Sequence, residues 1–100
     1  MKQTVNFYDF DRAFELADRL DNFSYDGRRA LFDYLEQYED DCDIELELDV
    51  IGLCCDFTEF ENLAEYNDAY SVRVVSLEEL AELTTVIRIP NSAGFIIANF

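Results

Sequence analysis

A long acidic run without any basic residue occupies the middle of this chain and limits how it can fold. Between residues 30 and 72 the sequence has fourteen aspartates and glutamates and no lysine or arginine, whereas the flanking segments hold nine acids and all seven bases. The formal charge is -16, and the repulsion among like charges costs stability that solubility alone does not require. Adaptation to high salt also makes surfaces acidic, but we expect it to spread the charge. The asymmetry therefore indicates a function for the acidic segment.

The composition indicates a folded, soluble protein despite this charge. Half of the 100 residues are hydrophobic and fifteen are aromatic, unlike the composition of disordered acidic chains. A chain of this length forms one ordinary domain, so we expect a single domain over residues 1–100. No stretch approaches the roughly twenty apolar residues of a membrane span, and no leader peptide is recognisable. We therefore expect a cytoplasmic protein.

Apolar spacing predicts two helices in the first forty residues. The first runs from Phe7 to Leu20, because apolar residues recur there every three or four positions, and Asn6 or Asp9 is the expected cap. The second begins after Ser24 as N-cap and runs to about Glu39. Its expected inward face is Leu31, Tyr34, Leu35 and Tyr38. Its expected solvent face is Asp33, Glu36, Glu39 and Asp40.

The hydrophobic period then changes from that of a helix to that of a strand. In "IELELDVIGLCCDF", residues 44–57, apolar and acidic residues alternate before the chain becomes continuously apolar, so we predict one long or bent strand with a possible bulge at Gly52. Thr58 and Glu61 form a possible capping box for a third helix, whose inward residues are expected to be Leu63, Ala64 and Tyr66.

The C-terminal third predicts a short helix and a hairpin. Ser76 and Glu79 repeat the capping pattern and open a helix that runs through about Leu83. Two β-rich runs then flank a turn that contains Pro90 and Gly94, which is typical of a hairpin. The prediction is an α+β fold in which three to four α-helices pack on a small, about three-stranded antiparallel β-sheet with a C-terminal β-hairpin.

Residue types argue against most enzymatic chemistry. The chain has no histidine, which removes the commonest general base and metal ligand. The odd set Cys42, Cys54 and Cys55 lacks zinc-site spacing and lies among acids, so we expect reduced, buried structural thiols. The acidic run lacks the central glycine and final glutamate of a calcium loop, and no glycine-rich phosphate loop is present. We expect no metal, no cofactor and no enzymatic activity.

The predicted elements arrange the acids in two rows. Four acids at helical spacing fall on one face of the second helix: Glu36, Glu39, Asp40 and Asp43. Three more lie on one side of the predicted strand, roughly 6.6 Å apart: Glu45, Glu47 and Asp49. Five more extend the surface along the third helix: Asp56, Glu59, Glu61, Glu65 and Asp68. With Asp33, these thirteen acids form the expected partner-binding surface, and its margin holds Tyr25, Tyr38, Tyr66 and Tyr70 as possible anchors.

Rows of negative charge resemble a nucleic-acid backbone, so a basic nucleic-acid-binding protein is the expected partner. The alternative interpretation is an ordinary solvated face. We expect neither direct nucleic-acid binding nor a membrane partner, since both are anionic. The chain is expected to be a monomer or a small homo-oligomer.

The segment "GRRALFDYLEQYEDDCDIELELDVIGLCCDFTEF", residues 27–60, and the ending "TTVIRI…GFIIANF" resemble a family of small acidic proteins from phages, plasmids and bacterial genomes. In size and charge the chain is also similar to phage anti-CRISPR and anti-restriction proteins that mimic DNA. This similarity implies a target among host defence nucleases, in the host cytoplasm. The implied site is the surface of a CRISPR effector that reads the PAM duplex.

Two other functions remain open from the sequence. One is an accessory module, antitoxin-like or scaffold-like, that binds through an apolar patch and is acidic only for solubility. The other is a small hydrolase that uses paired carboxylates, which requires a cleft with one carboxyl in an apolar setting.

Overall fold

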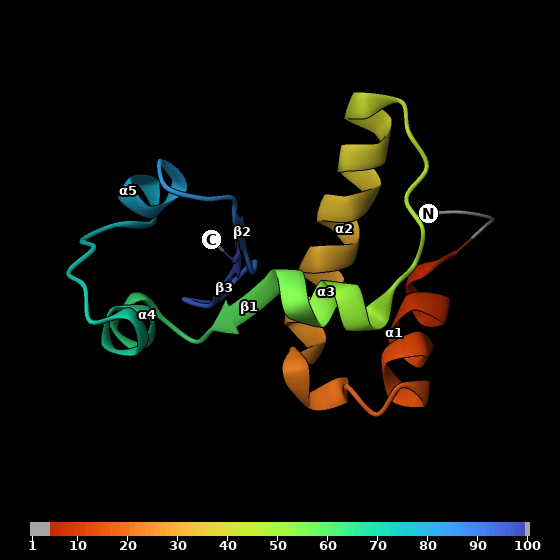
Figure 1. Ribbon diagram of the computed structural model, residues 1–100, viewed down its shortest axis with the longest axis horizontal. Helices are drawn as coiled ribbons and strands as arrows, with labels where there is room; N and C mark the ends of the chain where they lie inside the picture. Colours follow the sequence, from red (N-terminus) through yellow and green to blue (C-terminus); the bar gives the residue numbers. More distant parts are fainter. Residues whose placement is uncertain (1–4, 100) are drawn as a thin grey trace.

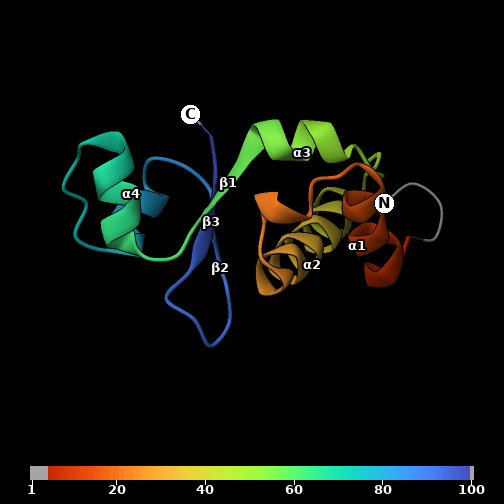
Figure 2. The same ribbon diagram turned by 90° about the horizontal axis from the view of Figure 1, so that it is seen from below.

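The computed structural model describes residues 5–99, which form an α+β fold in three layers (Figure 1). The elements along the chain are α1 (Phe7–Leu16), the short 3-10 helix η1 (Leu20–Asn22), α2 (Tyr25–Cys42), α3 (Val50–Asp56), β1 (Phe57–Phe60), α4 (Leu63–Tyr70), α5 (Leu77–Ala81), β2 (Val86–Arg88) and β3 (Phe95–Ala98). The sheet lies between α1, α2 and α3 on one face and α4 and α5 on the other, as Figures 1 and 2 show from two directions. The predicted α+β class with a small antiparallel sheet is confirmed.

Strand β3 is the centre of the sheet. The strand order is β1-β3-β2, and both pairings are antiparallel. Ile96 lies opposite Glu59 of β1 and Ile87 of β2. Three consecutive side chains of β3, those of Phe95, Ile96 and Ile97, are fully buried, as expected for a strand covered on both faces. The predicted C-terminal hairpin, β2 and β3, is confirmed.

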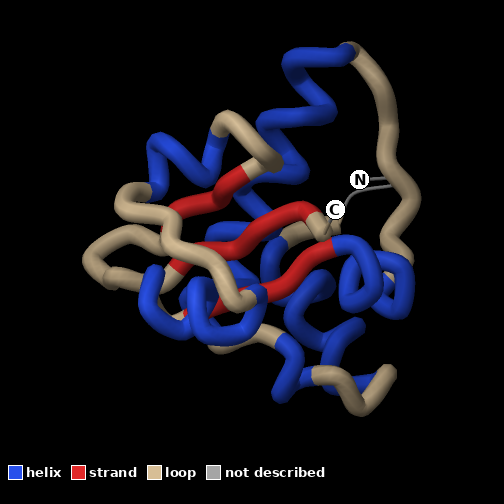
Figure 3. The backbone as a smooth tube through the Cα atoms, turned by 60° about the vertical axis from the view of Figure 1, so that its left-hand side comes forward, coloured by secondary structure: helices blue, strands red, loops and turns tan. Residues whose placement is uncertain are grey.

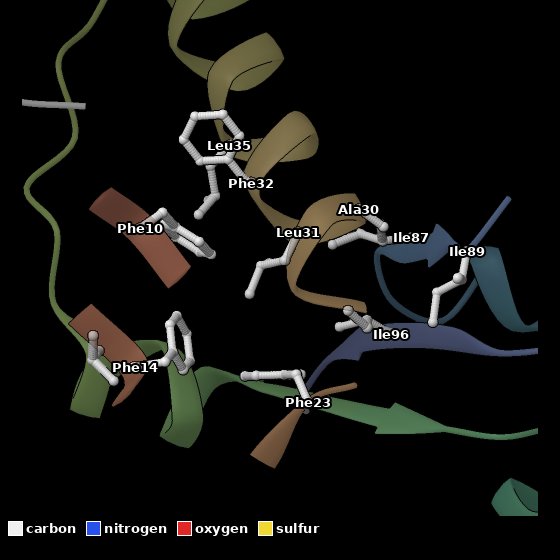
Figure 4. Close-up of a cluster of buried hydrophobic side chains, with 11 residues drawn as sticks. Phe10, Phe14, Phe23, Ala30, Leu31, Phe32, Leu35, Ile87, Ile89 and Ile96 are labelled. Carbon is white, nitrogen blue, oxygen red and sulfur yellow. The ribbon is translucent and has the colours of Figure 1, made fainter. Parts of the chain in front are cut away.

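The two faces of β3 point into two different hydrophobic clusters. Ile96 packs into the cluster that α1 and α2 supply, where Figure 4 shows it beside Ala30 and Leu31. Phe95 and Ile97 point the other way, into the cluster under α4 and α5. Because successive side chains of a strand point to opposite faces, this one short strand packs into both halves of the core.

The corner between α1 and α2 differs from the prediction. The first helix ends at Leu16 instead of Leu20, because Asp18 takes a left-handed conformation with φ 58°. The buried Arg28 then holds the corner: its Nη1 donates hydrogen bonds to the carbonyls of Leu20 (3.0 Å) and Phe23 (2.6 Å), and its Nε pairs with Asp11.

The predicted caps of these helices are confirmed. The Asn6 side chain accepts a hydrogen bond from the Asp9 N–H (2.9 Å), and the Asp9 carboxylate accepts one from the Asn6 N–H, which makes a capping box. The Ser24 hydroxyl accepts from the Gly27 N–H and caps α2. The second helix runs three residues beyond the expected Glu39, to Cys42.

The predicted long strand over residues 44–57 is wrong. Residues 44–49 are extended but belong to no strand, and they run outside the sheet from the end of α2 to the start of α3 (Figure 3). Leu46 and Leu48 pack inward, while Glu45, Glu47 and Asp49 are exposed. Apolar and acidic side chains therefore alternate between inside and outside as predicted, but the segment forms no hydrogen-bonded ladder with a strand. Residues 50–56 are the helix α3, because Asp49 caps them and Val50, Leu53 and Cys54 have helical spacing.

The predicted third helix begins later than expected. Thr58 lies in β1, so the capping box of Thr58 and Glu61 is wrong. Asn62 caps α4 instead, by accepting a hydrogen bond from the Glu65 N–H (2.8 Å). Within α4 only Tyr66 is buried, while Leu63 is half-buried and Ala64 is exposed. The Ser76 cap of α5 is confirmed, although that helix ends at Ala81.

The predicted burial of the cysteines is also wrong. All three are free thiols, but Cys42 and Cys55 are exposed and Cys54 is partly buried. The reason is that α3 lies on the surface and turns Cys55 away from the core, while Cys42 is the last residue of α2.

Shortening Ile96 to alanine should destabilise the protein by about 2 to 5 kcal/mol, because it opens a cavity where the central strand meets the α1–α2 layer. The measurement is the free energy of unfolding in urea. Val75→Ala, at a side chain that is 81% exposed, is the control and should change it by less than about 0.5 kcal/mol. Equal effects of the two substitutions would contradict the assigned role of β3.

Candidate functional site

A cleft of about 470 Å³ opens between α2, the extended segment 44–49, α3 and β1. Its lining combines aromatic and aliphatic side chains with carboxylates, and we call it the acidic cleft. The residues that line it are Tyr34, Leu35, Tyr38, Leu46, Glu47, Asp49, Gly52, Leu53, Asp56, Phe57 and Thr85. These elements follow one another along the chain, and their residues meet because α3 crosses in front of α2 (Figure 1).

The floor of the acidic cleft is apolar and aromatic. Leu46, Leu53 and Phe57 are half-buried and pack against the main core. The centroid of the Tyr34 ring lies 6.4 Å from the centroid of the Phe57 ring and 6.3 Å from the centroid of the Tyr38 ring. Tyr38 is 42% exposed, so an aromatic surface remains open to solvent at one side of the cleft.

The rim of the acidic cleft carries three exposed carboxylates, those of Glu47, Asp49 and Asp56. Asp49 caps α3, since its Oδ1 accepts a hydrogen bond from the Gly52 N–H (3.1 Å). A Cβ at position 52 would lie 2.7 Å from Asp49 Oδ2, so glycine permits this close approach. Within residues 5–99, the side chains of Glu47 and Asp56 form neither a hydrogen bond nor an ion pair.

The expected exposure of Glu39 is wrong. Its side chain is only 8% exposed, and its Oε2 accepts a hydrogen bond from the Leu46 N–H (2.6 Å). Glu39 thereby ties the extended segment to α2 and positions the wall of the acidic cleft. Burial by itself raises the pKa of Glu39, but hydrogen bonds to the carboxylate, including that from Leu46, outweigh it and leave the pKa below the ordinary 4.5.

The two predicted rows of acids do not form as expected. The helical row loses Glu39 to the interior, and Asp43 leaves the helix as its left-handed C-cap. The second row, Glu45, Glu47 and Asp49, is exposed on an extended segment instead of a strand. Of the remaining acids on α2, Asp33 pairs with Arg29 at 3.5 Å, Glu36 is half-buried and Asp40 is exposed.

The predicted acids from β1 onward lie at two other places. Glu59, Glu61 and Glu65 line a polar hollow of about 560 Å³ beside the start of α2. There Glu59 has a structural role, because its Oε1 accepts a hydrogen bond from the Ser24 N–H (2.9 Å) and its carboxylate lies against Gly27. Asp68 lies on α4 in a third hollow that also contains Arg73.

One expected aromatic anchor is buried. Tyr66 is 2% exposed and packs edge-on against Phe60, so it belongs to the core. Tyr25, Tyr38 and Tyr70 are exposed, and of these Tyr38 lines the acidic cleft.

The cleft residues that sequence reasoning missed as binding residues are the apolar ones. Tyr34 and Leu35 were expected on the inward face of a helix, and the sequence carries no sign that Leu53 and Phe57 share a cleft with them. The spacing of Val50, Leu53, Cys54 and Phe57, which is that of a helix, was the available signal for α3.

The carboxylates of the acidic cleft suit cation binding better than acid–base chemistry. A general acid requires a carboxyl in an apolar pocket, but the rim acids are exposed and the buried Glu39 has a lowered pKa. Burial raises the pKa of the Cys54 thiol, which disfavours its nucleophilic form. No group of three or more Cys, Asp or Glu side chains in the described part of the chain is arranged to hold a metal ion.

Comparison with family models, curated proteins and solved structures finds no match to this chain. The resemblance to small acidic phage and plasmid proteins therefore stays a prediction. Of the helices in residues 5–99, none is long and apolar enough to cross a membrane.

Replacing Glu39 by glutamine should make stability less dependent on pH. Because the folded-state pKa lies below 4.5, the charged carboxylate adds stability above about pH 4.5, and this contribution is lost as pH falls through the folded pKa. The gap in unfolding free energy between wild type and Glu39→Gln should therefore be widest near neutral pH and narrow below pH 4.5. Urea titrations at several pH values measure it, with Asp40→Asn as the exposed control; a gap independent of pH would contradict this role.

Proposed function

We propose that this protein is a non-enzymatic inhibitor that binds a basic nucleic-acid-binding protein and occupies the surface where that protein holds DNA. The observation that carries the proposal is the set of exposed, unpaired carboxylates around the acidic cleft. The ion pairs found within residues 5–99 involve Asp11, Asp33 and Glu78, and none involves an acid between positions 40 and 68. Among these acids, Glu47 and Asp56 also accept no side-chain hydrogen bond within residues 5–99, so their charge is available to a partner.

Electrostatics supports this partner class. A surface rich in lysine and arginine binds DNA largely by releasing condensed counterions, and a strongly negative protein surface attracts the same basic groove. The acidic surface here is not two regular rows. It follows the exposed end of α2, the extended segment and α3, where the exposed acids include Asp40, Glu45 and Glu47.

A host defence nuclease is the target class that we propose, with the PAM-reading surface of a CRISPR effector as the first candidate and a restriction enzyme as the second. Such a surface reads duplex DNA with arginines, which suits an acidic competitor. In this role the protein acts in the cytoplasm of the bacterial host, as a monomer or a small homo-oligomer.

A second candidate function is that of an accessory module that binds through an apolar patch. It is favoured by the loop after α4, where Val72 and Val75 are exposed and line the third hollow. Binding through this patch would depend weakly on salt, whereas binding through the acids weakens steeply as salt increases.

Reversing two acids should abolish inhibition. In the variant Glu45→Lys with Glu47→Lys, both positions are exposed, so we expect the fold to persist while attraction to the basic target becomes repulsion. The measurement is the affinity of purified CRISPR effectors and restriction enzymes for duplex DNA, with and without this protein. Wild type should weaken DNA binding by the target, and the effect should fall about tenfold or more between roughly 50 and 200 mM salt.

The matched control is Glu15→Lys with Glu82→Lys, which makes the same change in net charge at exposed positions outside the acidic segment. It should keep most of the inhibition. Equal loss in both variants would mean that only net charge matters, and inhibition that survives Glu45→Lys with Glu47→Lys would refute the proposal. Binding that depends on Val75 and resists salt would instead support the accessory module.

A further inference from the structure

We propose that the acidic cleft receives one arginine side chain of the basic partner. In this arrangement the guanidinium lies over the exposed aromatic surface of Tyr38 and pairs with the carboxylates of Glu47 and Asp56. The inference rests on the proposed function and deepens it, because it names the residue type on the partner that the site recognises. It also assigns a role to the apolar floor, which charge attraction alone leaves unexplained.

The lining of the cleft matches both parts of an arginine side chain. The half-buried surfaces of Leu46, Leu53 and Phe57 offer apolar contact to the methylene stem. The rings of Tyr34 and Tyr38, with centroids 6.3 Å apart, provide a face on which a planar cation can stack. The carboxylates stand at the rim, where the charged tip stays near water.

The protein already holds two of its own arginines in this manner. The Arg29 guanidinium lies 4.8 Å from the centroid of the Phe7 ring and 3.5 Å from the Asp33 carboxylate. Arg28 lies 5.9 Å from the Tyr25 ring centroid and pairs with Asp11. Each arginine thus combines one aromatic ring with one carboxylate. The acidic cleft presents the same two groups, and no cation of residues 5–99 forms an ion pair with Glu47 or Asp56.

Arginine fits better than the other cations a partner could offer. Its planar guanidinium can stack on a ring and donate to two carboxylates at once, whereas the lysine ammonium is a compact, strongly hydrated charge. A nucleic-acid phosphate is repelled by this rim. Lysine and an arginine from a second copy of this chain are therefore the competing occupants that the experiment has to separate.

The test uses a short glycine-flanked peptide with a single central arginine, and two further peptides with citrulline or lysine at that position. Citrulline keeps the shape of arginine without its charge. Dissociation constants are measured by NMR from the backbone amide shifts of Leu46, Leu53 and Phe57. The arginine peptide should shift these amides, the citrulline peptide should bind about tenfold more weakly, and the lysine peptide should bind about threefold more weakly.

Variants of the cleft separate the aromatic and the ionic contributions. Tyr38→Leu removes the ring and should weaken the arginine peptide about threefold, whereas Tyr38→Phe keeps the ring and should bind like wild type. Glu47→Gln with Asp56→Asn should weaken it about tenfold. Glu61→Gln with Asp68→Asn removes the same charge at exposed positions outside the cleft and should leave the affinity almost unchanged. Urea unfolding of each variant confirms that the fold persists.

Several results would overturn the inference while leaving the proposed function in place. Equal weakening by the two charge-removing pairs would mean that the acids act only through the overall field. Equal affinity of the arginine peptide for wild type and for Tyr38→Leu would mean that the ring of Tyr38 plays no part. Self-association that is lost in Glu47→Gln with Asp56→Asn, together with no peptide shift, would assign the cleft to a second copy. If the arginine peptide binds as expected but no DNA-binding protein is inhibited, the cleft stands and the proposed function fails.

Discussion

Strand β3 has no face that meets water, and the rest of the fold follows from that constraint. Phe95, Ile96 and Ile97 are consecutive and fully buried, so each face of the strand requires its own covering layer. The α1–α2 layer covers Ile96, and the α4–α5 layer covers Phe95 and Ile97. With both layers in place, β1 and β2 lie at the edges, and all the acidic residues except Glu59 of β1 lie on the helices and connections outside the sheet.

Three acids of the base-free segment, residues 30–72, accept hydrogen bonds from main-chain amides. Glu39 accepts from the Leu46 N–H, Asp49 from the Gly52 N–H and Glu59 from the Ser24 N–H. A backbone N–H that donates to a carboxylate stabilises the anion. These three acids therefore serve the fold, whereas Glu47 and Asp56 do not and remain available at the rim of the cleft. The acidic segment thus divides into structural and free carboxylates, which composition alone does not distinguish.

Sequence reasoning succeeded where local chemistry decides the structure. The caps at Asn6, Ser24 and Ser76 act through side-chain oxygens close to their own helices, and the hairpin around Pro90 depends on a local turn. It failed where tertiary packing decides. The apolar run of α3 is compatible with a strand or a helix, and whether Glu39 faces solvent depends on where the chain returns after α2. Of the cleft, the rim acids were predicted as binding residues, but their meeting with Tyr34 and Phe57 depends on how α3 crosses α2.

The wall of the acidic cleft is held by side chains and not by a ladder. In the described part of the chain, residues 44–49 form no strand pairing, and the Glu39 carboxylate attaches them to α2. A strand within a sheet cannot gain or lose one residue without turning every side chain to the other face, whereas this segment has no register to preserve. The strand pairing does not pass through this segment, whose Leu46 and Leu48 side chains pack against the core. The width of the acidic cleft can therefore change with the length of this segment while the pairing of β1, β3 and β2 stays the same.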